Sequence, residues 1–214
     1  MTNDVLDAKR WLLARDELLQ AEKALTAEHD HIAALRRKMP WQAVEKSYSF
    51  ELKGKQIGLS DLFQGRKQLI VYHHMFKPGD KNPCSGCGMV VDSISHLSHL
   101  HARNTSLVLV ATASQQEIAA FQKRMQWNHV WATTKDSFNA DFGVTDGFGL
   151  NVFFNEGDAV YRTYFTSGRG VEALGSTWSY LDLTPLGRQE TWEDSPEGAA
   201  QTPPYQWWRL HDLY

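Results

Sequence analysis

The sequence predicts a single α/β domain with a central mixed sheet and the core order β-α-β-α-β-β-α. Two apolar runs, at residues 67–76 and 106–112, alternate with segments of helical periodicity, which is typical of parallel βαβ units. A third segment, 150–165, contains the turn signal Asn-Glu-Gly-Asp and predicts an antiparallel hairpin. A chain of 214 residues suits one such domain with added elements at its ends.

The composition indicates a folded protein without a charged partner surface. Hydrophobic residues make up 42% of the chain and charged residues 22%, with a net charge of −3. This balance predicts no nucleic-acid partner. No run approaches the roughly 18 apolar residues of a membrane span, and charges interrupt the N-terminal segment where a secretory signal would be apolar. We therefore expect a cytoplasmic protein with no membrane contact.

The N-terminal part, residues 1–40, is expected to be a helical extension. Leucine pairs and isolated apolar residues recur over 4–38 between charges, which predicts one long amphipathic helix, or two helices broken near Thr26. Pro40 ends the pattern. This helix is expected to pack along its own domain, and the alternative is a subunit contact in a homodimer.

A domain over 41–184 follows. It begins with a β-hairpin around Lys53-Gly54-Lys55 and a single helical turn that ends at Gly65. The further elements expected in chain order are a strand at 67–76, a helix at 85–102, a strand at 106–112, a helix at 114–125 with a capping box, a short strand at 129–134, the hairpin at 150–165 and a helix at 170–181.

The last segment, 185–214, reads as a loop-like C-terminal extension. It ends in "YQWWRLHDLY", and so dense a group of aromatic side chains favours burial against protein over exposure to water. We expect this extension to dock on the domain or on a partner subunit.

The stretch "GDKNPCSGCGMVVDSI" carries the candidate chemistry. Cys84 and Cys87 are the only cysteines and lie three residues apart. They fall between the first buried strand and its helix, where open α/β sheets hold functional groups. The positive end of the helix dipole favours a thiolate, so Cys84 is the expected nucleophile, with Lys77 and Lys81 as supporting charges. Cys87, one turn further, is the expected resolving thiol, which closes a Cys84–Cys87 disulfide.

Two other roles of the cysteine pair stay open. The first is a non-enzymatic binding protein whose pair is vestigial or holds a metal. Structural zinc takes four ligands, and His96 lies nine residues beyond Cys87, roughly 13 Å along a continuous helix. We therefore predict no metal, and place His96 and His99 on the surface.

The second alternative, of lesser weight, is a thiol peroxidase. Peroxiredoxins place a threonine three residues and a proline seven residues before the peroxide-reactive cysteine. Before Cys84 those positions hold Lys81 and Lys77, and before Cys87 they hold Cys84 and Asp80. The peroxide-activating pattern is absent.

Two histidines end the first buried strand. His73 and His74 are adjacent and point to opposite faces of the sheet, so only one can face the cysteines. We expect His73 in that position, in a polar or proton-handling role, and a structural role is its alternative. Trp127, Trp131 and Phe148 are candidates to line a pocket, although such side chains are more often part of the core.

Five segments resemble one bacterial family: "LIVYHHMF", the loop ending in "CSGC", "DFGVTDGFGLNVFFNEG", "SYLDLTPLGRQE" and the terminal "WWRLHDLY". The family is domain of unknown function 899, whose members are often described as predicted dithiol–disulfide oxidoreductases. The resemblance covers nearly the whole chain and implies a thioredoxin-like fold with an N-terminal helix and a C-terminal extension. The family's cysteines map onto Cys84 and Cys87, and its strand-end histidine onto His73.

The resemblance implies a redox-active disulfide as the only prosthetic element, and a disulfide-containing protein or a small-molecule thiol as the partner. Two departures from thioredoxins matter. The segment before Leu150, "TDGFG", lacks the proline that thioredoxins place opposite the dithiol, which weakens a general protein-disulfide reductase role. The dipeptide between the cysteines is Ser-Gly, so no reduction potential carries over.

Overall fold

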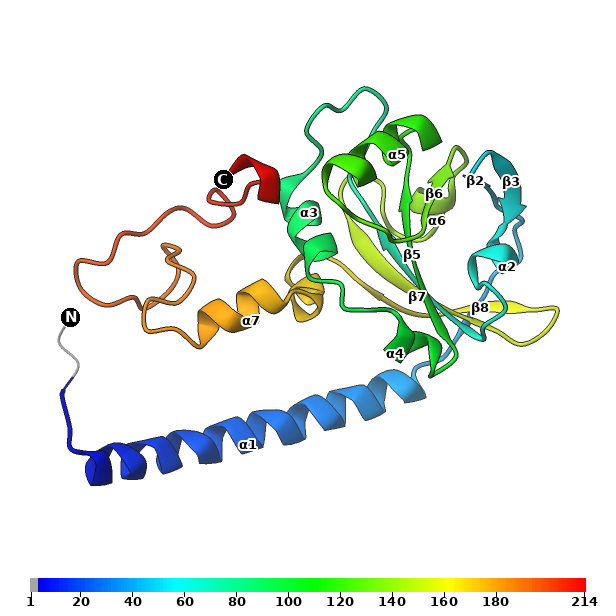
Figure 1. The fold of residues 1–214 in the computed structure, drawn as a ribbon. Coiled ribbons are helices and arrows are strands. Elements are labelled where there is room, and N and C mark those ends of the chain that lie inside the picture. The colour runs from blue at the N-terminus through cyan, green and yellow to red at the C-terminus, as the bar shows by residue number, and fades with distance from the viewer. Residues whose placement is uncertain (1–3) are drawn as a thin grey trace.

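The computed structural model describes residues 4–214, so residues 1–3 of the expected helical extension lie outside it. Eight strands form one mixed sheet in the order β1-β8-β7-β4-β5-β6-β2-β3 (Figure 1). The strands are β1 (Gln42–Ala43), β2 (Ser49–Leu52), β3 (Lys55–Gly58), β4 (Gln68–His73), β5 (Thr105–Ala111), β6 (Trp131–Thr134), β7 (Gly149–Asn155) and β8 (Val160–Thr166).

The centre of the sheet follows the apolar runs of the sequence. β4 and β5 pair in parallel, with Val71 opposite Val108, and β5 pairs in parallel with β6. β7 is antiparallel to both β4 and β8. The expected short strand at 129–134 is a full member of the sheet, because β6 also pairs with β2 and so joins the N-terminal hairpin to the core.

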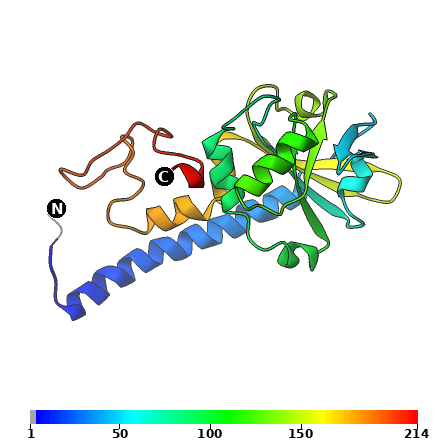
Figure 2. The same cartoon turned by 45° about the horizontal axis from the view of Figure 1, so that its top comes forward.

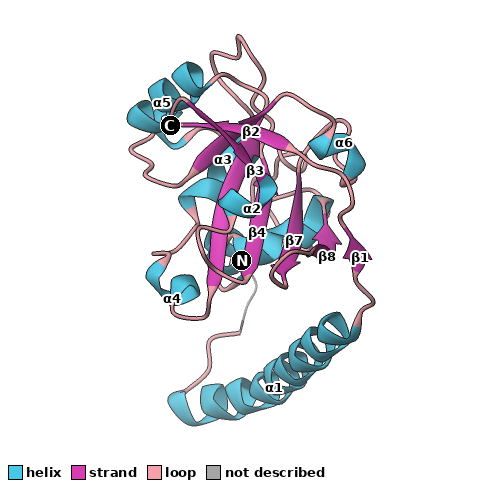
Figure 3. Cartoon of the chain, turned by 90° about the vertical axis from the view of Figure 1, so that its right-hand side faces the viewer, coloured by secondary structure: helices cyan, strands magenta, loops and turns pink. Residues whose placement is uncertain are grey.

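The helices cover the two faces of the sheet unequally (Figure 3). We call the face with α3 (Ser85–Asp92), α5 (Gln115–Arg124) and α7 (Ser176–Asp182) the site face. The opposite face carries α2 (Leu59–Leu62) and α6 (Phe138–Asp141) over a core rich in phenylalanine. Alternation along β4 sends Tyr72 to the site face and Val71 to the opposite face.

Two expected helices are each divided in the structure. The segment 85–102 forms α3 and a separate α4 (Ser98–His101), because the Ser93 hydroxyl bonds the Met89 carbonyl and the chain leaves the helix there. The segment 170–181 forms a 3₁₀ helix, η1 (Gly168–Leu174), and then α7, with Gly175 between them. By contrast, α5 has the predicted capping box, in which Ser114 and Glu117 bond each other's backbone N–H.

Helix α1 (Ala8–Lys38) is one continuous helix with no fully buried residue. It runs away from the sheet toward the N-terminal end (Figures 1 and 2), and contact with the domain includes the Arg36 guanidinium over the Tyr164 ring at 5.1 Å. Large apolar side chains of this helix are exposed: Trp11, Leu12, Leu13, Leu18, Leu25 and Leu35. A subunit contact through α1 stays a prediction. None of the helices described is both long and apolar enough to cross a membrane.

Phe138 holds the opposite face together, and its loss should destabilise the fold. The ring is fully buried and packs edge-on against Phe50 and Tyr48. We expect Phe138→Ala to lower the free energy of unfolding by about 3–5 kcal/mol, because it removes apolar contacts and leaves a cavity. Denaturant unfolding measures this change. Tyr180→Ala, at a 69% exposed position, is the control and should change it by less than about 0.5 kcal/mol.

Candidate functional site

Cys84 is the N-cap residue of α3. It follows the loop after β4, and its side chain is partly exposed. The Cys84 Sγ accepts a hydrogen bond from the Cys87 backbone N–H, with 3.4 Å between sulfur and nitrogen. The first turn of a helix leaves backbone N–H groups without partners, and these groups point toward the side chain of the N-cap residue. Here that side chain ends in a sulfur, so the backbone favours its ionised form.

The pKa of the Cys84 thiol is lowered from 9.0 to about 6. The largest cause is a hydrogen bond from the Cys87 thiol, which outweighs the opposing effect of partial burial. Hydrogen bonds from the backbone N–H groups of Cys87 and Gly86 lower the pKa further. Cys84 is therefore mainly a thiolate at neutral pH.

Cys87 lies behind Cys84 and is buried. The pKa of its thiol is raised well above 9.0, first by the hydrogen bond to Cys84, then by burial and by the charge of Cys84. Tyr72 opposes this shift, because its hydroxyl lies close enough to Cys87 to lower that pKa. The Tyr72 Oη is itself buried. Among residues 4–214 it has no partner at ordinary hydrogen-bond distance and angle, so its interaction with Cys87 is a weak one.

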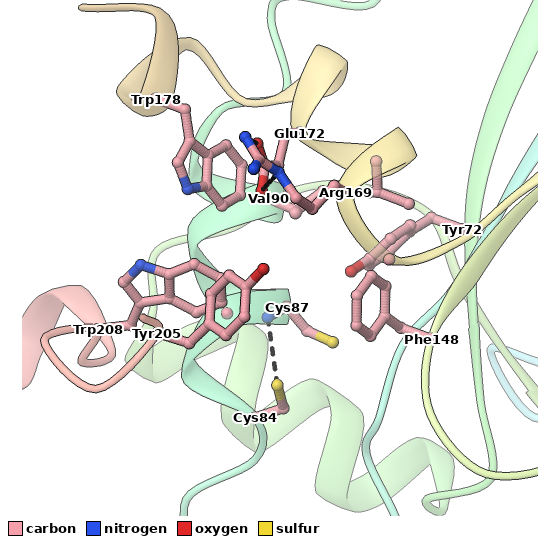
Figure 4. Close-up of a pocket in the computed structure, with 13 residues that line it drawn as sticks. Tyr72, Cys84, Cys87, Val90, Phe148, Arg169, Glu172, Trp178, Tyr205 and Trp208 are labelled. Atoms are coloured by element: carbon pink, nitrogen blue, oxygen red, sulfur yellow. Dashed lines mark hydrogen bonds and ion pairs between the residues drawn. The ribbon is translucent and has the colours of Figure 1, made fainter. Parts of the chain in front are cut away.

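A cavity of about 210 Å³ opens on the two cysteines. Figure 4 shows the hydroxyl groups of Tyr72 and Tyr205 directed into it from opposite sides. The lining residues come from β4, α3, the loop before β7, η1, α7 and the C-terminal extension: Tyr72, Cys84, Gly86, Cys87, Val90, Phe148, Gly168, Arg169, Val171, Glu172, Trp178, Tyr205 and Trp208.

The C-terminal extension forms one wall of this cavity by packing on α3. A Cβ atom on Gly86 would lie 2.5 Å from the Trp208 ring, and one on Gly88 would lie 2.8 Å from a Leu210 methyl group. Only glycine permits such close approach. The two glycines beside Cys87 therefore make room for Trp208 and for Leu210, which is 1% exposed.

Buried charges hold the extension in this position. Glu190 is 2% exposed and accepts hydrogen bonds from the Tyr205 backbone N–H and from the indoles of Trp192 and Trp207. Burial alone would raise the pKa of Glu190, but these bonds and the charge of Arg188 lower it below its ordinary value. The carboxylate is therefore ionised and fixes the start of the aromatic tail.

One ion pair and one histidine–carboxylate hydrogen bond fasten the end of the tail to the domain. Arg124 binds both carboxylate oxygens of Asp212, at 2.6 and 3.0 Å, and His211 Nδ1 lies 2.7 Å from Asp92 Oδ1. Further back, Arg188 makes a two-pronged contact with Asp182 in α7. The extension is thus tied to α5, α3 and α7.

His73 does not face the cysteines, and the expectation that it does is wrong. Its ring lies on the opposite face, stacked on Phe138. Nδ1 donates to Asn139 Oδ1 at 2.8 Å and Nε2 accepts from the Asn151 amide at 2.9 Å. Burial lowers the pKa of His73 to about 4, so the ring is neutral in a structural network.

The other candidates are also placed by the structure. His74 is on the site face, buried between Trp131 and Phe121, and does not line the cavity. Lys77 is exposed and pairs with Asp146 at 3.8 Å, and neither Lys77 nor Lys81 lines the cavity.

Of the three aromatic candidates, Phe148 lines the cavity, whereas Trp127 and Trp131 stack on each other away from it. Among residues 4–214, no three His, Cys, Asp or Glu side chains are grouped as a metal site.

Sequence reasoning missed most of the cavity wall. Tyr72 precedes the two histidines, and period-two alternation would have placed it on one face without saying which. Arg169 and Glu172 lie in the 3₁₀ helix η1, where only Glu172 falls within the helix expected over 170–181. For Tyr205 and Trp208 the only signal was a density of aromatic residues near the C-terminus, which indicates docking but not a position.

The geometry defines a class of protein. The four strands β8-β7-β4-β5 lie side by side with β7 antiparallel to the other three, and the cysteines occupy the first turn of the helix that follows β4. This is a thioredoxin-like protein, as the sequence resemblance implied. The chain belongs to the family described as bacterial protein of unknown function (DUF899), whose model matches residues 1–214.

Several solved structures match at low identity. The pneumococcal exposed lipoprotein thioredoxin Etrx1 from Streptococcus pneumoniae strain TIGR4 is 13% identical, with a TM-score of 0.43, over 57% of this chain and 90% of that one. The mitochondrial 2-Cys peroxiredoxin from Plasmodium falciparum is 14% identical, with a TM-score of 0.41, over 67% and 95%. A thioredoxin-like protein from Aeropyrum pernix is 15% identical, with a TM-score of 0.37, over 72% and 97%. No curated protein matches the chain.

The ionisation of Cys84 can be measured directly. We expect the rate of its alkylation by iodoacetamide to rise with pH through a midpoint near the pKa of about 6, because the thiolate is the reactive form. Cys87→Ala should move the midpoint upward, since it removes the thiol that donates to Cys84. Cys87→Ser keeps a donor and should move it less. A wild-type midpoint near the ordinary value of about 8.5 would contradict this account of the site.

Proposed function

We propose that this protein is a thiol–disulfide oxidoreductase in which Cys84 is the nucleophile and Cys87 the resolving thiol. One observation carries the proposal: a partly exposed thiolate caps α3 at the mouth of a cavity, with a second, buried thiol hydrogen-bonded to it. This arrangement supports attack on a disulfide from the cavity side and resolution from the protein side.

In the first step the Cys84 thiolate attacks one sulfur of a substrate disulfide. A bond forms between Cys84 Sγ and that sulfur, and the other substrate sulfur leaves as a thiolate that takes a proton from water. The low pKa of Cys84 supplies the thiolate at neutral pH without a general base. The product is a mixed disulfide, and Cys84 no longer carries a charge.

The second step is favoured by the first. Two of the three causes that raise the pKa of Cys87, namely the hydrogen bond to the Cys84 thiolate and its charge, disappear when Cys84 is in a mixed disulfide. Cys87 then loses its proton more easily, with the Tyr72 hydroxyl beside it. The Cys87 thiolate attacks Cys84, the second substrate sulfur leaves and takes up the proton that Cys87 released, and the Cys84–Cys87 disulfide forms. An external thiol reductant reverses the oxidation of the protein.

The reducing cytoplasm is the compartment that we propose for this reaction, because thiols are kept reduced there and paired cysteines are mostly catalytic or metal-binding. The competing proposal is a binding protein whose cysteine pair is vestigial or holds a metal. A thiol titration distinguishes the two, since a redox pair reacts as free thiols and a metal pair is masked until the ion is removed.

Substitution of each cysteine tests the assignment of roles. We expect Cys84→Ser to abolish reduction of a model disulfide, because it removes the nucleophile. Cys87→Ser should instead accumulate a mixed disulfide on Cys84, visible as an added mass in intact-protein mass spectrometry. Wild-type rates in both variants would overturn the mechanism, and accumulation on Cys87 in the Cys84→Ser variant would reverse the roles.

Tyr72→Phe tests the second step alone. The substitution removes a buried hydroxyl that makes no full hydrogen bond in the described part of the chain, so it should not impair folding. We expect resolution of the mixed disulfide to slow by about fivefold, because the Cys87 thiolate loses a nearby donor. Rapid mixing with a chromogenic disulfide resolves the two thiol releases, and the first release should keep its wild-type rate. Equal slowing of both releases would show that Tyr72 acts elsewhere.

A further inference from the structure

The cavity beside the cysteines limits what can reach Cys84. Its volume is about 210 Å³. An apolar cavity of roughly 150 Å³ holds one benzene ring, whereas drug-sized ligands need about 300–1,000 Å³. The cavity therefore fits one aromatic ring with a short substituent, and a folded segment of polypeptide is too large for it.

Aromatic side chains line the cavity on both sides of the cysteines. Phe148 projects from the loop before β7 on one side of the cysteines, and Tyr205 and Trp208 stand on the other (Figure 4). Tyr205 and Trp208 also contact each other, with ring centroids 4.8 Å apart, and Trp178 packs edge-on against Trp208 at 5.5 Å. These rings offer flat apolar surfaces to a ligand and no free backbone edge.

The charged residues at the rim are already neutralised. Arg169 Nε lies 3.2 Å from Glu172 Oε1, and the other oxygen of Glu172 binds Arg188 at 2.8 Å. The Arg169 guanidinium also lies over the Trp192 ring, 4.7 Å from its centroid. Arg169 and Glu172 therefore have partners within the protein, and the Cys84 thiolate at the cavity would repel a carboxylate group of a ligand.

Two hydroxyl groups, those of Tyr72 and Tyr205, are directed into the cavity (Figure 4). The Tyr72 hydroxyl lies close enough to Cys87 to lower the pKa of that thiol, so it serves the protein's own sulfur. The Tyr205 hydroxyl remains for a ligand to use, and a disulfide sulfur beside Cys84 can accept its hydrogen bond.

We propose that the substrate is a low-molecular-weight, uncharged disulfide that carries an aryl or arylmethyl group. This inference rests on the function proposed above and names its substrate class. The ring lies between Phe148, Tyr205 and Trp208, and the disulfide lies against Cys84. One substrate disulfide and the two protein thiols yield two small aromatic thiols and the Cys84–Cys87 disulfide. The substrate is thus reduced by two electrons and the protein is oxidised by two.

A matched pair of substrates tests charge and ring recognition together. Pre-reduced full-length protein is mixed with dibenzyl disulfide or bis(4-carboxybenzyl) disulfide, and each rate of protein oxidation is divided by the rate of that disulfide with free 2-mercaptoethanol. Glutathione disulfide and insulin serve as a charged non-aromatic and a protein substrate. We expect the normalised rate for dibenzyl disulfide to exceed each of the other three by about tenfold or more.

Substitutions in the cavity wall connect this preference to the structure. Tyr205 is half exposed, so Tyr205→Ala should fold normally, and it should lower the normalised dibenzyl disulfide rate by about tenfold and the glutathione disulfide rate by a much smaller factor. Trp208→Ala should act in the same direction. Trp11→Ala removes an exposed tryptophan on α1 and is the matched control with no expected effect.

The outcomes separate the two proposals. If none of the disulfides oxidises Cys84, the proposed function fails, and the substrate class with it. If Cys84 reacts but the normalised rates are equal, or if Tyr205→Ala lowers all rates equally, only the substrate class is overturned. Faster oxidation by cumene hydroperoxide than by any disulfide would overturn the disulfide assignment and favour a peroxidase.

Discussion

The rest of the candidate site depends on a sulfur atom that completes the first turn of α3. Because Cys84 Sγ accepts the Cys87 N–H, the same interaction ends the loop, begins the helix and stabilises the thiolate. It also places the second cysteine behind the first, where the hydrogen bond to Cys84 and burial keep the Cys87 thiol protonated. The Cys87 thiol lowers the pKa of Cys84 most and the backbone cap lowers it further, so the proposed reactivity requires no charged side chain beside the sulfur.

The C-terminal extension adds a wall to the open cavity at this helix start. The segment "YLDLTPLGRQE" supplies Asp182, Arg188 and Glu190, which lock α7 to the aromatic tail, and "HDLY" supplies the contacts to Arg124 and Asp92. The sequence motifs that are not general features of thioredoxins are thus the ones that build the wall of the cavity. In this chain the proposed nucleophile and the proposed selectivity reside in separate parts of the sequence.

Structural features that depend on residues close together in the sequence could be predicted from sequence patterns. The apolar runs gave β4 and β5, the Ser114–Glu117 spacing gave the start of α5, and the chain position of Cys84 gave the helix cap. Features that depend on packing were not predictable. Alternation could not say which of two adjacent histidines faced the cysteines, and the partner of Gly86 lies more than a hundred residues away. Contacts between residues so far apart produce no periodic pattern in a single sequence.

The order of protein synthesis determines when the wall of the cavity can form. Translation proceeds from the N-terminus, and domains fold as their residues emerge. The strands and helix that present Cys84 leave the ribosome well before Trp208, because Trp208 lies more than a hundred residues later in the sequence. A nascent chain therefore carries Cys84 without this wall until Trp208 has emerged. Chains stalled before Trp208 should react with the bulky disulfides that we propose the finished protein to exclude.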